Sequence, residues 1–84
     1  MNIEEQEFLR EVGARLRARR EDRGMTQAQL ARQCGLHRTF IGSVERGERN
    51  VSVLNLRLIA RRLRVPLAEL LSDATTADGG PAPN

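Results

Sequence analysis

Apolar residues recur along this chain at the spacing of one helix face, and no segment forms a convincing strand. Two long segments carry such a stripe: Phe8, Leu9, Val12 and Leu16 within residues 4–23, and Val53, Leu56, Ile59, Ala60 and Leu63 within residues 53–64. Two short segments between them, residues 27–34 and 37–46, have a narrower apolar side, and Pro66 opens a short last helix, PLAELL. The pattern predicts an all-α domain of five helices.

Glycines and capping residues indicate where these helices end and begin. Gly24, Gly35 and Gly47 follow the first three helices, where a glycine commonly stops a helix. Thr26 precedes the second helix as its N-cap, and Gln29, three residues later, completes a capping box. The second and third helices are therefore short and joined by a tight glycine turn, which is typical of a helix-turn-helix.

The composition narrows the class of protein. Residues 73–84 contain no large apolar side chain, so we expect a disordered tail after one folded domain, residues 1–72. The chain has one cysteine, Cys34, and one histidine, His37, which excludes an internal disulfide and a Cys/His zinc site. We expect no metal and no cofactor. The chain has no run of about 18 apolar residues and no signal peptide, so we expect a cytosolic protein.

The charge of the chain favours a polyanionic partner. All 14 basic residues are arginines, and the formal net charge is +3. The alternative is that most arginines are solvated and replace lysine through codon bias. The placement of the arginines has to decide between the two.

A helical wheel of residues 37–46 separates an aliphatic side from a side that could enter a DNA groove. Ile41 and Val44 lie on one side, and the opposite side holds Arg38, Thr39, Gly42, Ser43 and Arg46. Arginine can bind the edge of guanine with two hydrogen bonds, and small residues allow close approach. Gly42 costs about 1 kcal/mol relative to alanine inside a helix. We interpret it as leaving room for the groove wall.

The segment GMTQAQLARQCGLHRTFIGSVERGERNVS resembles the Xre/Cro/CI-like helix-turn-helix family. The family pattern is carried here by Thr26, Gln27, Leu30, Ala31, Gly35, Leu36, Ile41, Glu45, Arg46 and Gly47. Within the family, HRTFI and ERGERNVS are most similar to the controller proteins of restriction–modification systems. The resemblance implies a five-helix, lambda-repressor-like fold. Phe40 stands where many controllers have tyrosine, which removes a phenol hydroxyl that could contact phosphate.

The resemblance also implies roles for individual residues. Gln27 is expected to contact a DNA phosphate, the alternative being a solvated amide. Arg38 is expected to be the main reader of bases, with a phosphate clamp or an ion pair as alternatives. Arg46 is expected to contact phosphate unless it pairs with Glu45 or Glu48. The full candidate interface is Thr26, Gln27, His37, Arg38, Thr39, Gly42, Ser43, Arg46, Arg49 and Asn50.

Other residues of this region have less certain roles. Ser43 could contact a base, directly or through water, or make no contact. His37 is interpreted as a cap rather than a phosphate ligand, and Phe40 as a core residue that could instead lean on the DNA. Glu45 is expected to be structural, and Cys34 to be a small buried hydrophobe.

Apolar residues outside the helix stripes predict a homodimer through the last two helices, with Leu54, Leu58, Leu67, Leu70 and Leu71 at the interface. A twofold dimer reads a palindromic operator in double-stranded DNA. The resemblance adds two dimers on adjacent sites and RNA polymerase as further partners.

We therefore expect a DNA-binding transcriptional regulator, encoded by a bacterium or a phage and acting at the nucleoid. The preferred form is an autoregulatory controller, and the alternatives are a phage-type repressor or an antitoxin-like regulator. A protein-interaction or bridging module without base readout is the alternative from another class. An enzyme is excluded because nucleophile–base pairs and phosphate-binding loops are lacking.

Overall fold

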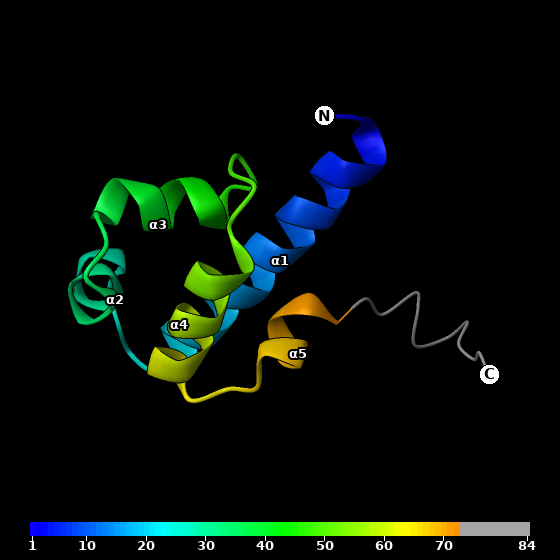
Figure 1. The fold of residues 1–84 in the computed structure, drawn as a ribbon. Coiled ribbons are helices and arrows are strands. Elements are labelled where there is room, and N and C mark those ends of the chain that lie inside the picture. Colours follow the sequence, from blue (N-terminus) through cyan, green and yellow to red (C-terminus); the bar gives the residue numbers. More distant parts are fainter. Residues whose placement is uncertain (73–84) are drawn as a thin grey trace.

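The computed structural model describes residues 1–72, and the tail predicted at residues 73–84 lies outside this part of the chain. The described part holds five helices and no strand (Figure 1). Their bounds are α1 (Ile3–Asp22), α2 (Gln27–Cys34), α3 (Arg38–Glu45), α4 (Val53–Leu63) and α5 (Leu67–Leu71). The predicted all-α class is confirmed, and the predicted bounds agree to within one residue.

Side-chain caps begin four of these helices, and the capping box predicted at Thr26 and Gln29 is confirmed. In α2, the hydroxyl of Thr26 accepts the N–H of Gln29 at 3.0 Å, and Oε1 of Gln29 accepts the N–H of Thr26 at 2.8 Å. Ser52 caps α4 by accepting the N–H of Asn55 at 3.1 Å. These bonds satisfy backbone donors that the first turn of a helix leaves unpaired.

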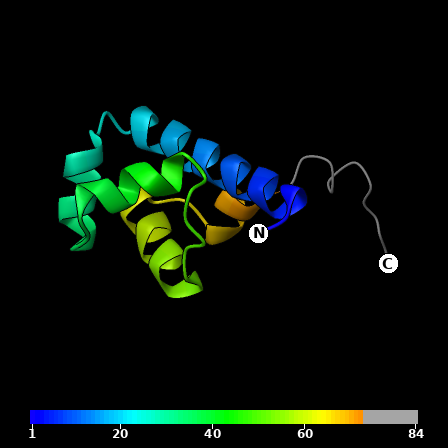
Figure 2. The ribbon, with the colours of Figure 1, turned by 90° about the horizontal axis from the view of Figure 1, so that it is seen from above.

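Helix α1 forms one long side of the molecule, and α3 lies along it in the view of Figure 2. Helix α2 contacts α3 and α4, and the short α5 packs between α1 and α4. The side chains at the centre are almost entirely aliphatic; those that are fully buried and largest are Leu16, Leu30, Ile41, Ile59, Leu63 and Leu70. This core fixes α2 and α3 on one side of the domain.

Two predicted core residues lie at the surface. Phe8 is 39% exposed and Val53 is 67% exposed, so their assignment to the inner stripes was wrong. Phe8 lies on the N-terminal part of α1, and Val53 is the first residue of α4. A wheel assigns both to a buried face, but both side chains line an open pocket at the edge of the domain instead of the core.

Gly13 allows α1 and the end of α3 to touch backbone to backbone. It lies buried within α1, and a Cβ atom there would collide with the carbonyl oxygens of Val44 and Glu45. The role of Gly13 was not predicted from the sequence. The available signal was a glycine on the same helix as the apolar stripe, where it costs about 1 kcal/mol.

Candidate nucleic-acid interface

The angle between α2 and α3 is set by a glycine turn. Gly35 ends α2 in the left-handed conformation with φ 68°, which a glycine adopts without steric cost. The N–H of Leu36 then donates to the carbonyl of Ala31 at 2.9 Å, closing the last turn of α2. Two residues later α3 begins at Arg38, so its first turn is presented at the surface.

His37 caps α3, which confirms its predicted structural role. Its Nδ1 accepts the N–H of Thr39 at 3.2 Å and lies 2.8 Å from the Thr39 hydroxyl oxygen. The cap holds the exposed Thr39 side chain at the helix start, directly beside Arg38.

Arg38 and Thr39 are exposed, as the wheel predicted. Within residues 1–72 the guanidinium of Arg38 makes no ion pair and no hydrogen bond to another side chain. The alternative of a structural ion pair for Arg38 therefore finds no support. An arginine at the start of this helix can present all of its donors to a partner.

The predicted exposure of Gly42 and Ser43 was wrong. Both are buried, and the hydroxyl of Ser43 donates to the carbonyl of Phe40 at 2.8 Å within α3. Gly42 lies beneath the side chains of Gln27 and Arg46. The wheel could not show this, because the cover over Gly42 comes partly from another helix.

A buried ion pair connects α1 to the end of α3. Arg20 binds Glu45 with two hydrogen bonds, Nε to Oε2 at 2.6 Å and Nη2 to Oε1 at 3.0 Å. Its Nη1 also donates to the carbonyl of Met25 at 2.7 Å, just before α2. The pKa of Arg20 is raised, mainly by its hydrogen bond to Glu45. The structural role predicted for Glu45 is thus confirmed.

Gln27 joins this network from the first position of α2. Its Nε2 donates to Oε1 of Glu45 at 3.0 Å. Gln27 is half-buried, so it is not the freely solvated amide of the alternative interpretation. Neither Arg20 nor this bond was predicted. The signal was present, because Arg20 continues the spacing of Val12 and Leu16 along α1.

Arg46 pairs with Glu48 at the exit of α3. The two side chains share hydrogen bonds of 3.0 and 3.1 Å, and both are well exposed. The hydrogen bond raises the pKa of Arg46 and lowers the pKa of Glu48. The predicted alternative of an ion pair is confirmed for Glu48 and not for Glu45. Such an exposed pair can open when a phosphate competes for the arginine.

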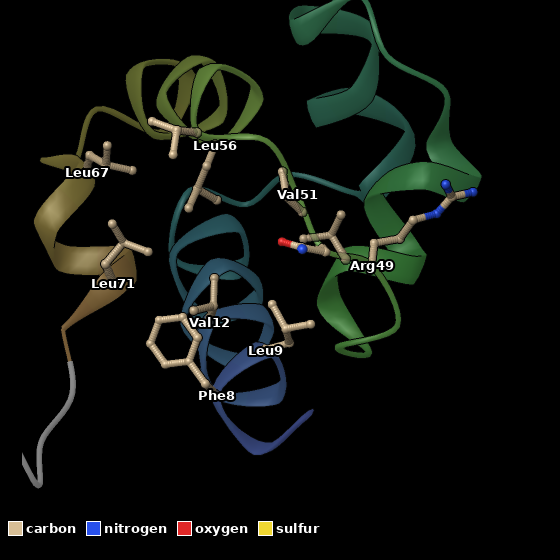
Figure 3. A pocket seen from close by; sticks show the side chains of 11 residues that line it. Phe8, Leu9, Val12, Arg49, Val51, Leu56, Leu67 and Leu71 are labelled. Atoms are coloured by element: carbon tan, nitrogen blue, oxygen red, sulfur yellow. The ribbon is translucent and has the colours of Figure 1, made fainter. Parts of the chain in front are cut away.

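The loop after α3 carries Arg49 and Asn50, both exposed. The guanidinium of Arg49 lies over the ring of Phe40, 5.5 Å from its centre, within the range of a cation–π contact. Phe40 is half-buried and packs against the core, as predicted. Figure 3 shows Arg49 extending away from the apolar pocket beside it, toward the side of the molecule that carries α3.

The predicted dimer residues differ in how much surface they offer. Leu54 is 71% exposed and Leu71 is 36% exposed, whereas Leu58 and Leu67 are half-buried against the core. The assignment of Leu70 to the interface was wrong. It is fully buried, because α5 turns this residue inward, between α1 and α4.

Residues 1–72 also contain one cysteine, and they contain no cluster of metal ligands and no membrane-spanning helix. Cys34 is buried, as predicted, and this burial raises the pKa of its thiol. Within residues 1–72 no three His, Cys, Asp or Glu side chains gather where they could hold a metal ion. None of the helices in this range is long and apolar enough to cross a bilayer.

Two short helices joined at a fixed angle, with an exposed arginine opening the second, define a helix-turn-helix protein. The chain belongs to the helix-turn-helix family HTH_3, which matches residues 16–70. Membership in this family makes the protein a regulator that binds double-stranded DNA, and not an enzyme.

Relatives of this chain include several restriction–modification control proteins. It is 46% identical to control protein C.SmaI of Serratia marcescens over 68% of each chain. It is 50% identical to C.BamHI of Bacillus amyloliquefaciens over 62% of this chain, or slightly less than two thirds of that protein (63%). The crystal structure of the controller protein C.AhdI from Aeromonas hydrophila superposes with a TM-score of 0.72 at 44% identity, covering 74% of this chain and 94% of that one.

Proposed function

We propose that this protein is a sequence-specific transcriptional regulator that binds a palindromic operator as a homodimer and controls a restriction–modification system, its own gene included. One observation carries the proposal. The exposed Arg38 and Thr39 open a short helix whose position is fixed by a buried network, the arrangement that base readout in a major groove requires. The similarity to C.SmaI and C.AhdI supports the controller type. Such a regulator acts in the cytoplasm.

In the proposed complex, contacts divide between bases and backbone. Arg38 reads a guanine edge, and Thr39 contacts a neighbouring base. Gln27 and the free N–H groups at the start of α2 bind a phosphate, with Thr26 and His37 as flanking residues. Arg46, Arg49 and Asn50, exposed at the exit of α3, bind the backbone on the other side. Gly42 and Ser43 are buried and act within α3 rather than on the DNA.

A dimer face is proposed around the exposed start of α4 and the end of α5. Val53 and Leu54 are 67% and 71% exposed, and Val53 lines the same pocket as Leu71. A cavity of about 180 Å³ opens beside them, lined mostly by apolar side chains from α1, α4, α5 and the loop before α4 (Figure 3). A second copy would cover this surface and set two recognition helices about one DNA turn, or 34 Å, apart. Two dimers on adjacent sites and RNA polymerase are further proposed partners.

Selection of bound DNA from a random pool tests base readout directly. We expect the unmodified chain to select a palindrome, and Arg38→Ala to lose one base preference worth about 1–3 kcal/mol. Arg57→Ala is the matched control, because Arg57 is an exposed arginine on α4. Unchanged preference in Arg38→Ala would remove this residue as the reader.

The dimer is tested separately by light scattering coupled to size exclusion. Leu54→Asp should yield a folded monomer at micromolar concentration where the unmodified chain is a dimer. Ile3→Asp is the matched control, since Ile3 is also 71% exposed. A dimer that survives Leu54→Asp would place the interface elsewhere.

A phage-type repressor is the second candidate. The chain is 33% identical to the immunity repressor of Bacillus phage phi105 over 76% of its own length and 44% of that protein. The neighbouring genes decide between the two. Methyltransferase and endonuclease genes beside this one would support a controller, and phage genes would support a repressor.

A further inference from the structure

The proposed DNA contacts do not explain why a glycine, Gly42, stands inside α3. It is buried inside the helix, where glycine costs about 1 kcal/mol relative to alanine. A Cβ atom at this position would lie 3.3 Å from Oε1 of Gln27 and 3.2 Å from Nη1 of Arg46. Both distances are slightly shorter than an ordinary van der Waals contact of a Cβ atom, so either side chain would have to move by a few tenths of an ångström. The space over Gly42 is therefore filled by two polar side chains from opposite ends of the helix-turn-helix.

Gln27 reaches this space from the other helix and is held there. Its Nε2 donates to Oε1 of Glu45 at 3.0 Å, and Arg20 holds the same carboxylate from α1. An amide nitrogen carries two N–H groups, so one remains after the bond to Glu45. The carboxamide thus crosses Gly42 to reach Glu45 and keeps one donor for another partner.

We infer that Gly42 is a positioning residue for the DNA contact of Gln27. The missing side chain lets the carboxamide lie across α3 and stay bound to Glu45, which directs its second N–H toward a backbone phosphate. This inference rests on the proposed function. It also replaces the simpler view of Gly42, in which the glycine only lets the helix approach the groove wall.

The two explanations differ in whether Gly42 acts through Gln27. If Gly42 positions the carboxamide, then Gly42→Ala harms binding only while Gln27 is present. If Gly42 provides clearance for the DNA, its replacement harms binding whatever residue stands at position 27. A double-mutant cycle separates these cases, because it measures the coupling between two residues.

The experiment compares operator affinity for the unmodified chain, Gly42→Ala, Gln27→Ala and the double variant, using the sequence selected from the random pool. We expect each single change to weaken binding about 3- to 10-fold, the scale of one hydrogen bond. The double variant should bind no more weakly than Gln27→Ala. Gln33→Ala is the matched control on α2, since Gln33 is exposed and no side-chain bond of it occurs in residues 1–72.

Two further measurements keep a structural effect apart from a positioning effect. The unfolding midpoint of Gly42→Ala should not fall, because alanine favours the helix. The side-chain amide signals of Gln27 in the NMR spectrum, assigned by their loss in Gln27→Ala, should shift in Gly42→Ala without DNA.

Independent, additive losses in the cycle would overturn the inference, as would unshifted Gln27 signals. Both results leave operator binding by the unmodified chain intact, so the proposed function would stand. A chain that selects no sequence at all would overturn the proposed function and this inference together.

Discussion

Two neighbouring residues at the end of α3, Glu45 and Arg46, each belong to an arginine–glutamate pair. One pair is buried and the other is exposed to water. Arg20–Glu45 has hydrogen bonds of 2.6 and 3.0 Å, and its side chains are 9% and 3% exposed. Arg46–Glu48 has bonds of 3.0 and 3.1 Å, and its side chains are 60% and 57% exposed. Both pairs have two hydrogen bonds, and the largest difference between them is their exposure to water.

Burial decides what each of these two pairs does. Removing one partner of a buried pair strands a charge away from water, whereas an exposed charge is simply rehydrated. Arg20–Glu45 therefore fixes the positions of α1, α2 and α3, with Met25 and Gln27 as additional partners. Arg46–Glu48 keeps an arginine at the surface, where a phosphate can replace Glu48 as its partner.

The largest effect is expected from breaking the buried pair. Arg20→Met leaves the Glu45 carboxylate without its ion partner and should lower the free energy of unfolding by about 3–5 kcal/mol. Urea unfolding followed by circular dichroism measures the change. A loss below about 1 kcal/mol, the range of surface pairs, would mean that this buried pair contributes no more than an exposed one.

Removing both charges of the buried pair should cost less than removing one. The double variant Arg20→Met with Glu45→Leu leaves no stranded charge, and buried pairs replaced by apolar residues are often tolerated. We therefore expect the free energy of unfolding of the double variant to exceed that of Arg20→Met by at least about 2 kcal/mol. Further destabilisation by the second change, in the same urea experiment, would show that the ion pair itself is required.

The exposed pair should matter for DNA and hardly for stability. Arg46→Ala should change the free energy of unfolding by less than about 0.5 kcal/mol. Its operator affinity should fall for all sequences alike, and the slope of log affinity against log salt should decrease by about 1. Glu48→Ala is the control, since it frees Arg46 without removing a cation. An unchanged salt slope would place Arg46 away from the phosphates.

The smallest expected effect is the change that Arg46→Ala causes in the pKa of Glu48. The hydrogen bond from Arg46 lowers the pKa of this carboxyl in the folded state. A lowered folded pKa means that the stabilisation is present above the unfolded pKa and is lost as the pH falls through the folded value. An NMR titration should show the pKa of Glu48 rising toward its ordinary value in Arg46→Ala. An unmoved pKa would mean that the pair does not form in solution.

Periodicity and capping residues were enough to predict the five helices and their bounds. The spacing of Val12 and Leu16, the cap at Thr26 and the turn at Gly35 are local features, and each helix end depends on residues within a few positions. The exposure of Arg38 and Thr39 was predictable from the wheel of α3 alone.

The inner side of the candidate interface could not be predicted in this way. Gly42 is covered by Gln27 from α2, and Glu45 is held by Arg20 from α1. A wheel of one helix contains no information about a cover that comes from another. The same limit explains Leu70, because α5 has only five residues and its direction is set by α1 and α4.

The lengths of α2 and α3 have a consequence for how the protein opens. Each has only eight residues, and isolated helices shorter than about 12–15 residues are marginal in water. The two helices cannot persist without α1 and the core, so the backbone amides that are hydrogen-bonded within them should exchange with deuterium mainly when the whole domain unfolds. Proteases and chaperones would therefore meet this helix-turn-helix either folded together with the whole domain or unfolded together with it.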